Sequence, residues 1–126
     1  MMKYFLSLGS NIDAKINLDF AQNELKKILT NIRLSSIHTT KAEGFDGDDF
    51  LNLVISGESD DSFEEINNKL KSIEDDAGRD RDAPKFSSRT LDIDIILQID
   101  KNEEIVFESD EIQKYNFVSD PLKELI

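Results

Sequence analysis

Two carboxylates stand inside an apolar strand pattern, in the stretch RTLDIDIIL at residues 89–97. Apolar and polar residues alternate there, which predicts a strand with Asp92 and Asp94 side by side on one face. Adjacent carboxylates repel each other, and Asp is rare in strands, so the pair needs an explanation. One explanation is simple exposure to solvent. The other is a site for a hard cation, because Mg²⁺ prefers carboxylate oxygens supplemented by substrate phosphates.

A cluster of cations precedes the carboxylate pair. Four of the chain's 15 basic residues fall within one short segment: Arg79, Arg81, Lys85 and Arg89. The planar guanidinium group can donate two hydrogen bonds to one phosphate group. These cations could also be solvated and paired with aspartates of the same loop. Beside the Asp pair, however, they favour phosphoryl-group chemistry, in which positioning and electrostatic stabilisation dominate.

Composition limits the classes of partner. The net charge of −12 argues against a general nucleic-acid or anionic-membrane surface, since both attract basic patches. No apolar run approaches the ~20 residues of a membrane span, no signal peptide is evident, and there are no cysteines. We expect one cytoplasmic, monomeric domain over residues 1–126.

The periodicities predict six elements that would position these residues. The strands are expected at 4–8, 32–39, 50–56 and 90–99, and the helices at 14–29 and from Ser62 to Ala77. Ser62 and Glu65 form a capping-box pattern at the second helix. A short edge strand at 105–107 and a last helix opened by Asp120 and Pro121 complete the chain. The order β-α-β-β-α-β predicts an α+β, ferredoxin-like fold, with a mainly antiparallel sheet and helices on one face.

Four fragments together resemble the 6-hydroxymethyl-7,8-dihydropterin pyrophosphokinase family. They are LGSN (8–11), FLN (50–52), IE…GR-x-R (73–81) and RTLDIDI (89–95), in the family's order and at nearly its spacings. The resemblance covers roughly residues 4–108. It implies transfer of the terminal diphosphate of ATP to the hydroxymethyl group of the pterin, in folate biosynthesis. ATP would be the co-substrate, and two Mg²⁺ ions would be required.

The resemblance also assigns roles to individual residues. Asp92 and Asp94 would bind both ions, and Arg79, Arg81 and Arg89 would act in catalysis and contact the phosphates. The remaining nucleotide contacts would be Lys71 and Glu74. The pterin site would comprise Thr40, Gly44, Phe50, Asn52, Phe86 and Phe117. Phe50 and Phe117 would sandwich the pterin ring, although core packing also explains both. The buried Asn52 amide would bond the pterin edge. Phe86 stands in the family's Trp position, in a loop (79–88) that we expect to be mobile and to close over nucleotide.

The C-terminal segment departs from the family pattern. The family's Pro-His pair is absent, Tyr115 stands in place of an Arg, and the loop is shorter. These groups serve ATP in the family. One alternative is therefore a degenerate, non-catalytic relative that binds a pterin, a metal or a protein partner. Another is a generic ferredoxin-like interaction domain, because this fold hosts many functions.

Overall fold

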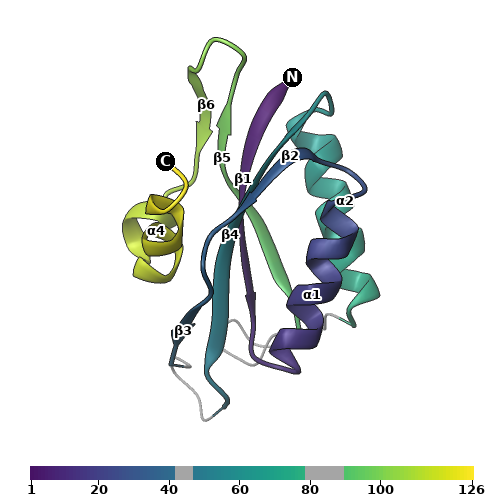
Figure 1. The fold of residues 1–126 in the computed structure, drawn as a ribbon, viewed down its shortest axis with the longest axis vertical. Helices are drawn as coiled ribbons and strands as arrows, with labels where there is room; N and C mark the ends of the chain where they lie inside the picture. Colours follow the sequence, from purple (N-terminus) through teal and green to yellow (C-terminus); the bar gives the residue numbers. More distant parts are fainter. Residues whose placement is uncertain (42–46, 79–89) are drawn as a thin grey trace.

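The protein is described by a computed structural model over residues 1–41, 47–78 and 90–126. Its strands are β1 (Met2–Ser10), β2 (Thr30–Leu34), β3 (His38–Thr40), β4 (Phe50–Ser59), β5 (Asp92–Ile99) and β6 (Ile105–Glu108). Its helices are α1 (Ala14–Leu25), α2 (Phe63–Asp76), α3 (Glu111–Lys114) and α4 (Asn116–Lys123). Figure 1 shows α1 and α2 on one side of the sheet and α4 on the other.

The strands form one antiparallel sheet in the order β2-β4-β1-β5-β6, with β3 also paired to β4. The prediction of an α+β fold with a mainly antiparallel sheet is therefore confirmed. The expectation that the helices lie on one face is wrong for α4, which packs on the face opposite α1 and α2 (Figure 1). The strand predicted at 32–39 is split into β2 and β3, which pair with different parts of β4. Between them, Ser35 turns inward and its hydroxyl accepts a hydrogen bond from the Val54 N–H at 2.9 Å.

Side-chain alternation divides the core into two clusters. On the first face, residues such as Leu8, Ile93 and Ile95 pack under α1 and α2. On the second face, the core is formed by Phe5, Val54, Ile96, Leu97, Val118, Leu122 and Leu125. The last three come from α4 and the residues that follow it. This second face is the one that would carry Asp92 and Asp94. Its middle is covered by α4.

A register shift in β5 makes this second cluster possible. Phe5 is opposite Leu97, but the next residue, Leu6, is opposite Ile95, so Ile96 is the extra residue of a β-bulge. The bulge directs Ile96 and Leu97 to the same face, where both belong to the second core cluster, the one that α4 covers. Strict alternation would have directed one of them to the other face.

The two long helices follow the predicted pattern with one difference in length. The Ser62 hydroxyl accepts the Glu65 N–H at 3.2 Å, and Glu65 accepts the Ser62 N–H at 3.0 Å, so the capping box is confirmed. The first helix ends at Leu25 instead of continuing to Leu29. Leu29 is nevertheless buried, against Gly57, where a Cβ atom would lie only 2.8 Å from the Leu29 Cβ.

The prediction that the last helix opens at Asp120 and Pro121 is wrong. The helix α4 begins at Asn116, and Pro121 lies buried inside it. Proline in a helix costs a backbone hydrogen bond, and in α4 it occurs in a helix whose Val118 and Leu122 are buried against the sheet. Within the described residues, no helix is long and apolar enough to cross a membrane.

Candidate active site

Four strands place a row of aligned residues on the second face of the sheet. Gly9 of β1 lies opposite Asp92 of β5 on one side and Asn52 of β4 on the other, and Asn52 lies opposite His38 of β3. Asp94 lies opposite Ser7, one step along the same face. Asp92 is half-buried and Asp94 is exposed. The predicted shared face of the two aspartates is confirmed.

The amide of Asn52 is fixed within this row. Only 4% of the residue is exposed, and its Nδ2 donates to the Thr40 Oγ1 at 2.8 Å. The Asn52 Oδ1 lies over Gly9, where a Cβ atom would approach it to 3.0 Å. A side chain at position 9 would therefore press on the amide, so the glycine leaves the space that Asn52 occupies.

The two polar residues after Gly9 form hydrogen bonds to the segments that directly precede the neighbouring strands β5 and β4. The Ser10 hydroxyl donates to the Thr90 carbonyl, just before β5, and the Asn11 Nδ2 donates to the Asp48 carbonyl at 3.0 Å, just before β4. Both residues are buried. The sequence offered a signal for this role, since two polar residues directly follow an apolar strand, but the role itself needs the tertiary partners.

Both aromatic candidates belong to the second face. Phe50 lies two residues before Asn52 in β4, and Phe117 of α4 packs against the second core cluster. The Phe117 ring stacks on Tyr115, with centroids 4.8 Å apart and an interplanar angle of 21°. Tyr115 therefore extends the aromatic surface at the position where the family pattern has an Arg.

Glu111 is a further carboxylate, at the start of α3, that interacts electrostatically with Asp92. Burial raises the pKa of Glu111, and the negative charges of Asp92 and Asp110 raise it further. Glu111 is the first residue of α3, so this helix places an acidic side chain where it senses the charge of Asp92. The sequence analysis did not identify Glu111, because its proximity to Asp92 depends on how the chain turns after β6.

The predicted nucleotide residues of α2 lie in different surroundings. Lys71 is exposed, whereas Glu74 is only 3% exposed. The Glu74 Oε2 accepts the backbone N–H of Ile93 at 2.7 Å, between the two aspartates. That both residues contact nucleotide remains a prediction.

Several predicted site residues lie outside the described part of the chain: Gly44, Arg79, Arg81, Phe86 and Arg89. The expected mobility of 79–88 and its closure over nucleotide fall there too, as does the expected proximity of Arg81 and Arg89 to the Asp pair. Across residues 1–41, 47–78 and 90–126, no group of three or more His, Cys, Asp or Glu residues has a metal-binding arrangement. Two carboxylates on one face still fit Mg²⁺, which takes its other ligands from water and phosphate.

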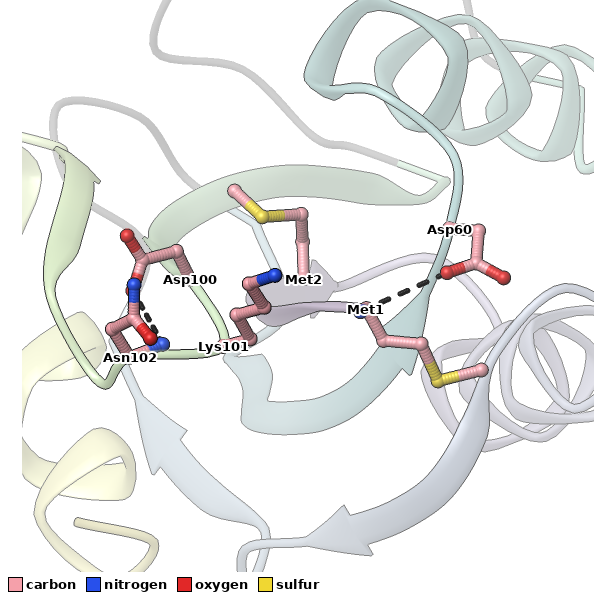
Figure 2. A pocket seen from close by; sticks show the side chains of 6 residues that line it. All are labelled: Met1, Met2, Asp60, Asp100, Lys101 and Asn102. Carbon is pink, nitrogen blue, oxygen red and sulfur yellow. Dashed lines mark hydrogen bonds and ion pairs between the residues drawn. The ribbon is translucent and has the colours of Figure 1, made fainter.

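A separate cavity of about 250 Å³ lies at the other end of β1 and β5, lined by Met1, Met2, Asp60, Asp100, Lys101 and Asn102. Figure 2 shows the ion pair from the Met1 ammonium group to Asp60, at 3.7 Å, and the bond from the Asn102 N–H to Asp100. It shares no residue with the row that contains Asp92 and Asn52. We therefore do not assign it to the same site.

The fold and this face together define an α+β domain with a candidate small-molecule site, containing two carboxylates and a fixed amide. Residues 5–126 match the model of the 7,8-dihydro-6-hydroxymethylpterin-pyrophosphokinase family, and the chain belongs to this family. It is 32% identical to a 2-amino-4-hydroxy-6-hydroxymethyldihydropteridine pyrophosphokinase of Aquifex aeolicus, over 80% of this chain and 64% of that protein. It is 30% identical to the protein of the same name from Haemophilus influenzae, over 99% of this chain and 82% of that protein. The chain thus spans somewhat less than two thirds of the Aquifex relative.

Proposed function

We propose that the protein is an ATP-dependent pyrophosphokinase that transfers diphosphate to 6-hydroxymethyl-7,8-dihydropterin in folate biosynthesis. The observation that carries this proposal is the row in which Gly9 aligns Asn52 with Asp92 on one face. A group suited to a heterocycle edge and a group suited to a metal–phosphate complex then lie on β4 and β5, the two strands that flank β1 in the sheet. Membership of the family and the names of the two relatives support the same reaction.

The metal-binding part of the proposal rests on Asp92 and Asp94. Their carboxylates would hold two Mg²⁺ ions together with the oxygens of ATP. Such ions supply charge neutralisation at the polyphosphate and a template for in-line attack on the β-phosphorus by the pterin hydroxyl, with AMP as the leaving group. Asp94, which is exposed, and Asp92, which is half-buried, both leave room for ligands beyond the protein.

The nucleotide part of the proposal rests on cations. Arg79, Arg81 and Arg89 would contact the phosphates, because guanidinium groups bind phosphate oxygens in pairs. Lys71, which is exposed on α2, would add a further positive charge. Glu74, a carboxylate on the same helix, is also predicted to contact the nucleotide. Phe86, in the same loop as these arginines, would belong to the pterin site.

The pterin part of the proposal rests on one amide side chain that lies on the same face as two aromatic rings. Asn52 would bond the heterocycle with its amide, held in place by Thr40. Phe50 and Phe117 would stack on the two sides of the ring, and Gly44 would line the pocket. The protein would act as a cytoplasmic monomer, with small molecules as its partners.

One observation favours a second candidate, a relative that binds pterin without turnover. Tyr115 stacks on Phe117 where the family pattern has an Arg that serves ATP. The test is a coupled assay for AMP release from ATP with Mg²⁺, with and without the pterin. The pyrophosphokinase proposal predicts AMP release only when the pterin is present. Pterin binding without AMP release would support the second candidate.

A further inference from the structure

A buried carboxylate on α2 is directed at the strand that carries the aspartate pair. Glu74 is 3% exposed, and the other buried residues of α2 are Ile66, Leu70 and Ile73, all apolar. A carboxylate in such surroundings needs strong hydrogen-bond partners, because burial removes it from water. One partner is the Ile93 N–H, which donates to the Glu74 Oε2 at 2.7 Å. This is a short, charge-assisted bond.

The backbone of β5 needs such an acceptor at this point. β1 pairs with β5 from Asp92 to Ile99 on one side. On the other side, β6 pairs with β5 only between Leu97 and Ile99, so within the described part of the chain no strand flanks that edge at Ile93. Ile93 is 3% exposed, and a buried N–H without an acceptor destabilises the conformation that contains it. The Glu74 carboxylate supplies the acceptor that the Ile93 N–H needs at this edge.

We propose that Glu74 is a positioning residue for the metal site formed by Asp92 and Asp94. Its carboxylate fixes the peptide between the two aspartates, and so sets the spacing and direction of both carboxylates toward bound Mg²⁺. α2 packs on the first face, whereas the aspartates project from the second, so Glu74 acts through the backbone. This inference rests on the proposed function, and it differs from a direct nucleotide contact because it predicts an effect on metal binding when no nucleotide is present.

Two substitutions separate the reach of this side chain from its charge. Glu74→Gln removes the charge but keeps an oxygen at the same distance from the backbone. Glu74→Asp keeps the charge but withdraws the oxygens by about one bond length, roughly 1.5 Å, too far for the Ile93 N–H. If the hydrogen bond to Ile93 is what matters, Gln is tolerated and Asp is not. If a charge near the nucleotide is what matters, the order is reversed.

The measurements use the full chain and Mn²⁺ alone as the probe. Amide hydrogen exchange by NMR reports the protection of Ile93, and broadening of the Asp92–Asp94 amides during a Mn²⁺ titration reports metal binding. We expect Glu74→Asp to lose Ile93 protection and to weaken Mn²⁺ binding by about tenfold or more. We expect Glu74→Gln to retain both Ile93 protection and Mn²⁺ binding, because a neutral amide oxygen still accepts the Ile93 N–H, though less strongly than a carboxylate. Glu64→Gln, on an exposed position of the same helix, controls for the change in net charge.

Wild-type behaviour of Glu74→Asp, or loss of either signal in Glu74→Gln, would overturn the inference. If the Asp variant does not fold, the Gln variant decides by itself, since loss of Ile93 protection or of Mn²⁺ binding there contradicts the proposed role. Asp94→Ala distinguishes this from failure of the proposed function. If Asp94→Ala binds Mn²⁺ as the wild-type chain does, the metal site itself is wrong. If it loses Mn²⁺ while Glu74→Asp keeps it, only the role of Glu74 is wrong.

Discussion

Among single residues, the aspartate pair and Asn52 depend on different kinds of constraint. Strand alternation alone directs Asp92 and Asp94 to one face, whatever lies beside the strand. The position of Asn52 depends on a neighbour without a side chain, Gly9, and on the hydroxyl of Thr40. We therefore expect substitution of an aspartate to affect catalysis and substitution of Gly9 to affect pterin binding.

Asp94→Ala should leave the fold intact and abolish turnover. Asp94 is exposed, and its removal relieves repulsion with Asp92, so the melting temperature should hold or rise. Loss of a ligand to a catalytic metal should cost several kcal/mol of transition-state stabilisation. Circular dichroism and the AMP-release assay check the two halves of this prediction. Near-normal turnover in a folded variant would count decisively against the metal mechanism.

Gly9→Ala should weaken pterin binding more than it weakens the fold. The added methyl group would lie 3.0 Å from the Asn52 Oδ1, so the amide must shift, and its bond to Thr40 is strained or lost. Overpacking of this kind typically costs about 1 to 3 kcal/mol of stability. Calorimetric titration with the pterin measures the effect. The double variant with Asn52→Ala should bind no worse than Asn52→Ala alone, because both substitutions act on one group. Additive losses would show that Gly9 acts elsewhere.

Among the elements, α4 is held to the sheet by its apolar side and by polar contacts near its C-terminal end. Glu124 accepts the Ser36 N–H at 2.8 Å and the Ser36 hydroxyl at 2.8 Å, and it pairs with the His38 Nε2 at 2.5 Å. Arg33 of β2 donates to the Leu125 carbonyl at 3.3 Å. These contacts fix the helix that carries Phe117 against the β2–β3 side of the sheet.

The Glu124 contacts should make stability depend on pH in acid. Hydrogen bonds from the Ser36 N–H, His38 and the Ser36 hydroxyl lower the pKa of Glu124 from 4.5 to about 2. The folded state therefore favours the ionised carboxylate. Its contribution is fully present above pH 4.5 and is lost as the pH falls toward about 2. Urea unfolding of the wild-type chain and of Glu124→Gln should give a stability difference that shrinks as the pH falls from 4.5 toward about 2. A difference that does not change with pH would contradict the assignment.

Ser56→Ala should not destabilise the protein. Ser56 lies in β4 with 0% exposure, and its hydroxyl is the buried side-chain group without a hydrogen-bond partner within the described residues. An unsatisfied buried hydroxyl costs about 1 to 3 kcal/mol, so its removal should leave the free energy of unfolding unchanged or raise it. Chemical denaturation measures this change. A loss well above 1 kcal/mol would reveal a partner for the hydroxyl, such as an ordered water molecule.

The whole molecule carries a net charge of −12, and it must bind an anionic nucleotide if the proposed function holds. The metal ions and the Arg cluster would have to offset that repulsion locally. We expect calorimetric titration to show ATP binding with Mg²⁺ and little or none with a chelator present. Pterin binding should survive the chelator, because the pterin is uncharged.

The same titration tests the altered C-terminal segment. With Tyr115 in place of the family's Arg, we expect weaker ATP binding than in relatives that keep the Arg. Undetectable ATP binding with Mg²⁺, together with preserved pterin binding, would refute the kinase and support the binding-only relative.

The amino-acid sequence by itself determined the elements whose signals are local. The alternation of β5 from Asp92 to Ile95, the capping box at Ser62 and the helical stripe of α2 all appear as predicted, because each depends on residues within a few positions of one another. The resemblance to the family, too, came from the sequence, through four short motifs taken together in their order and spacing. The split into β2 and β3 and the start of α4 were not evident from the sequence, because each depends on what the segment packs against.

The tertiary structure decided how those elements meet. The row of His38, Asn52, Gly9 and Asp92 exists because β1 pairs with β4 on one side and with β5 on the other, in one particular register. The bond from Ile93 to Glu74 joins an element on the first face to the strand that carries the aspartates. No local pattern encodes a register between distant segments or the acceptor of a particular buried N–H, because both are fixed by the packing of the whole core.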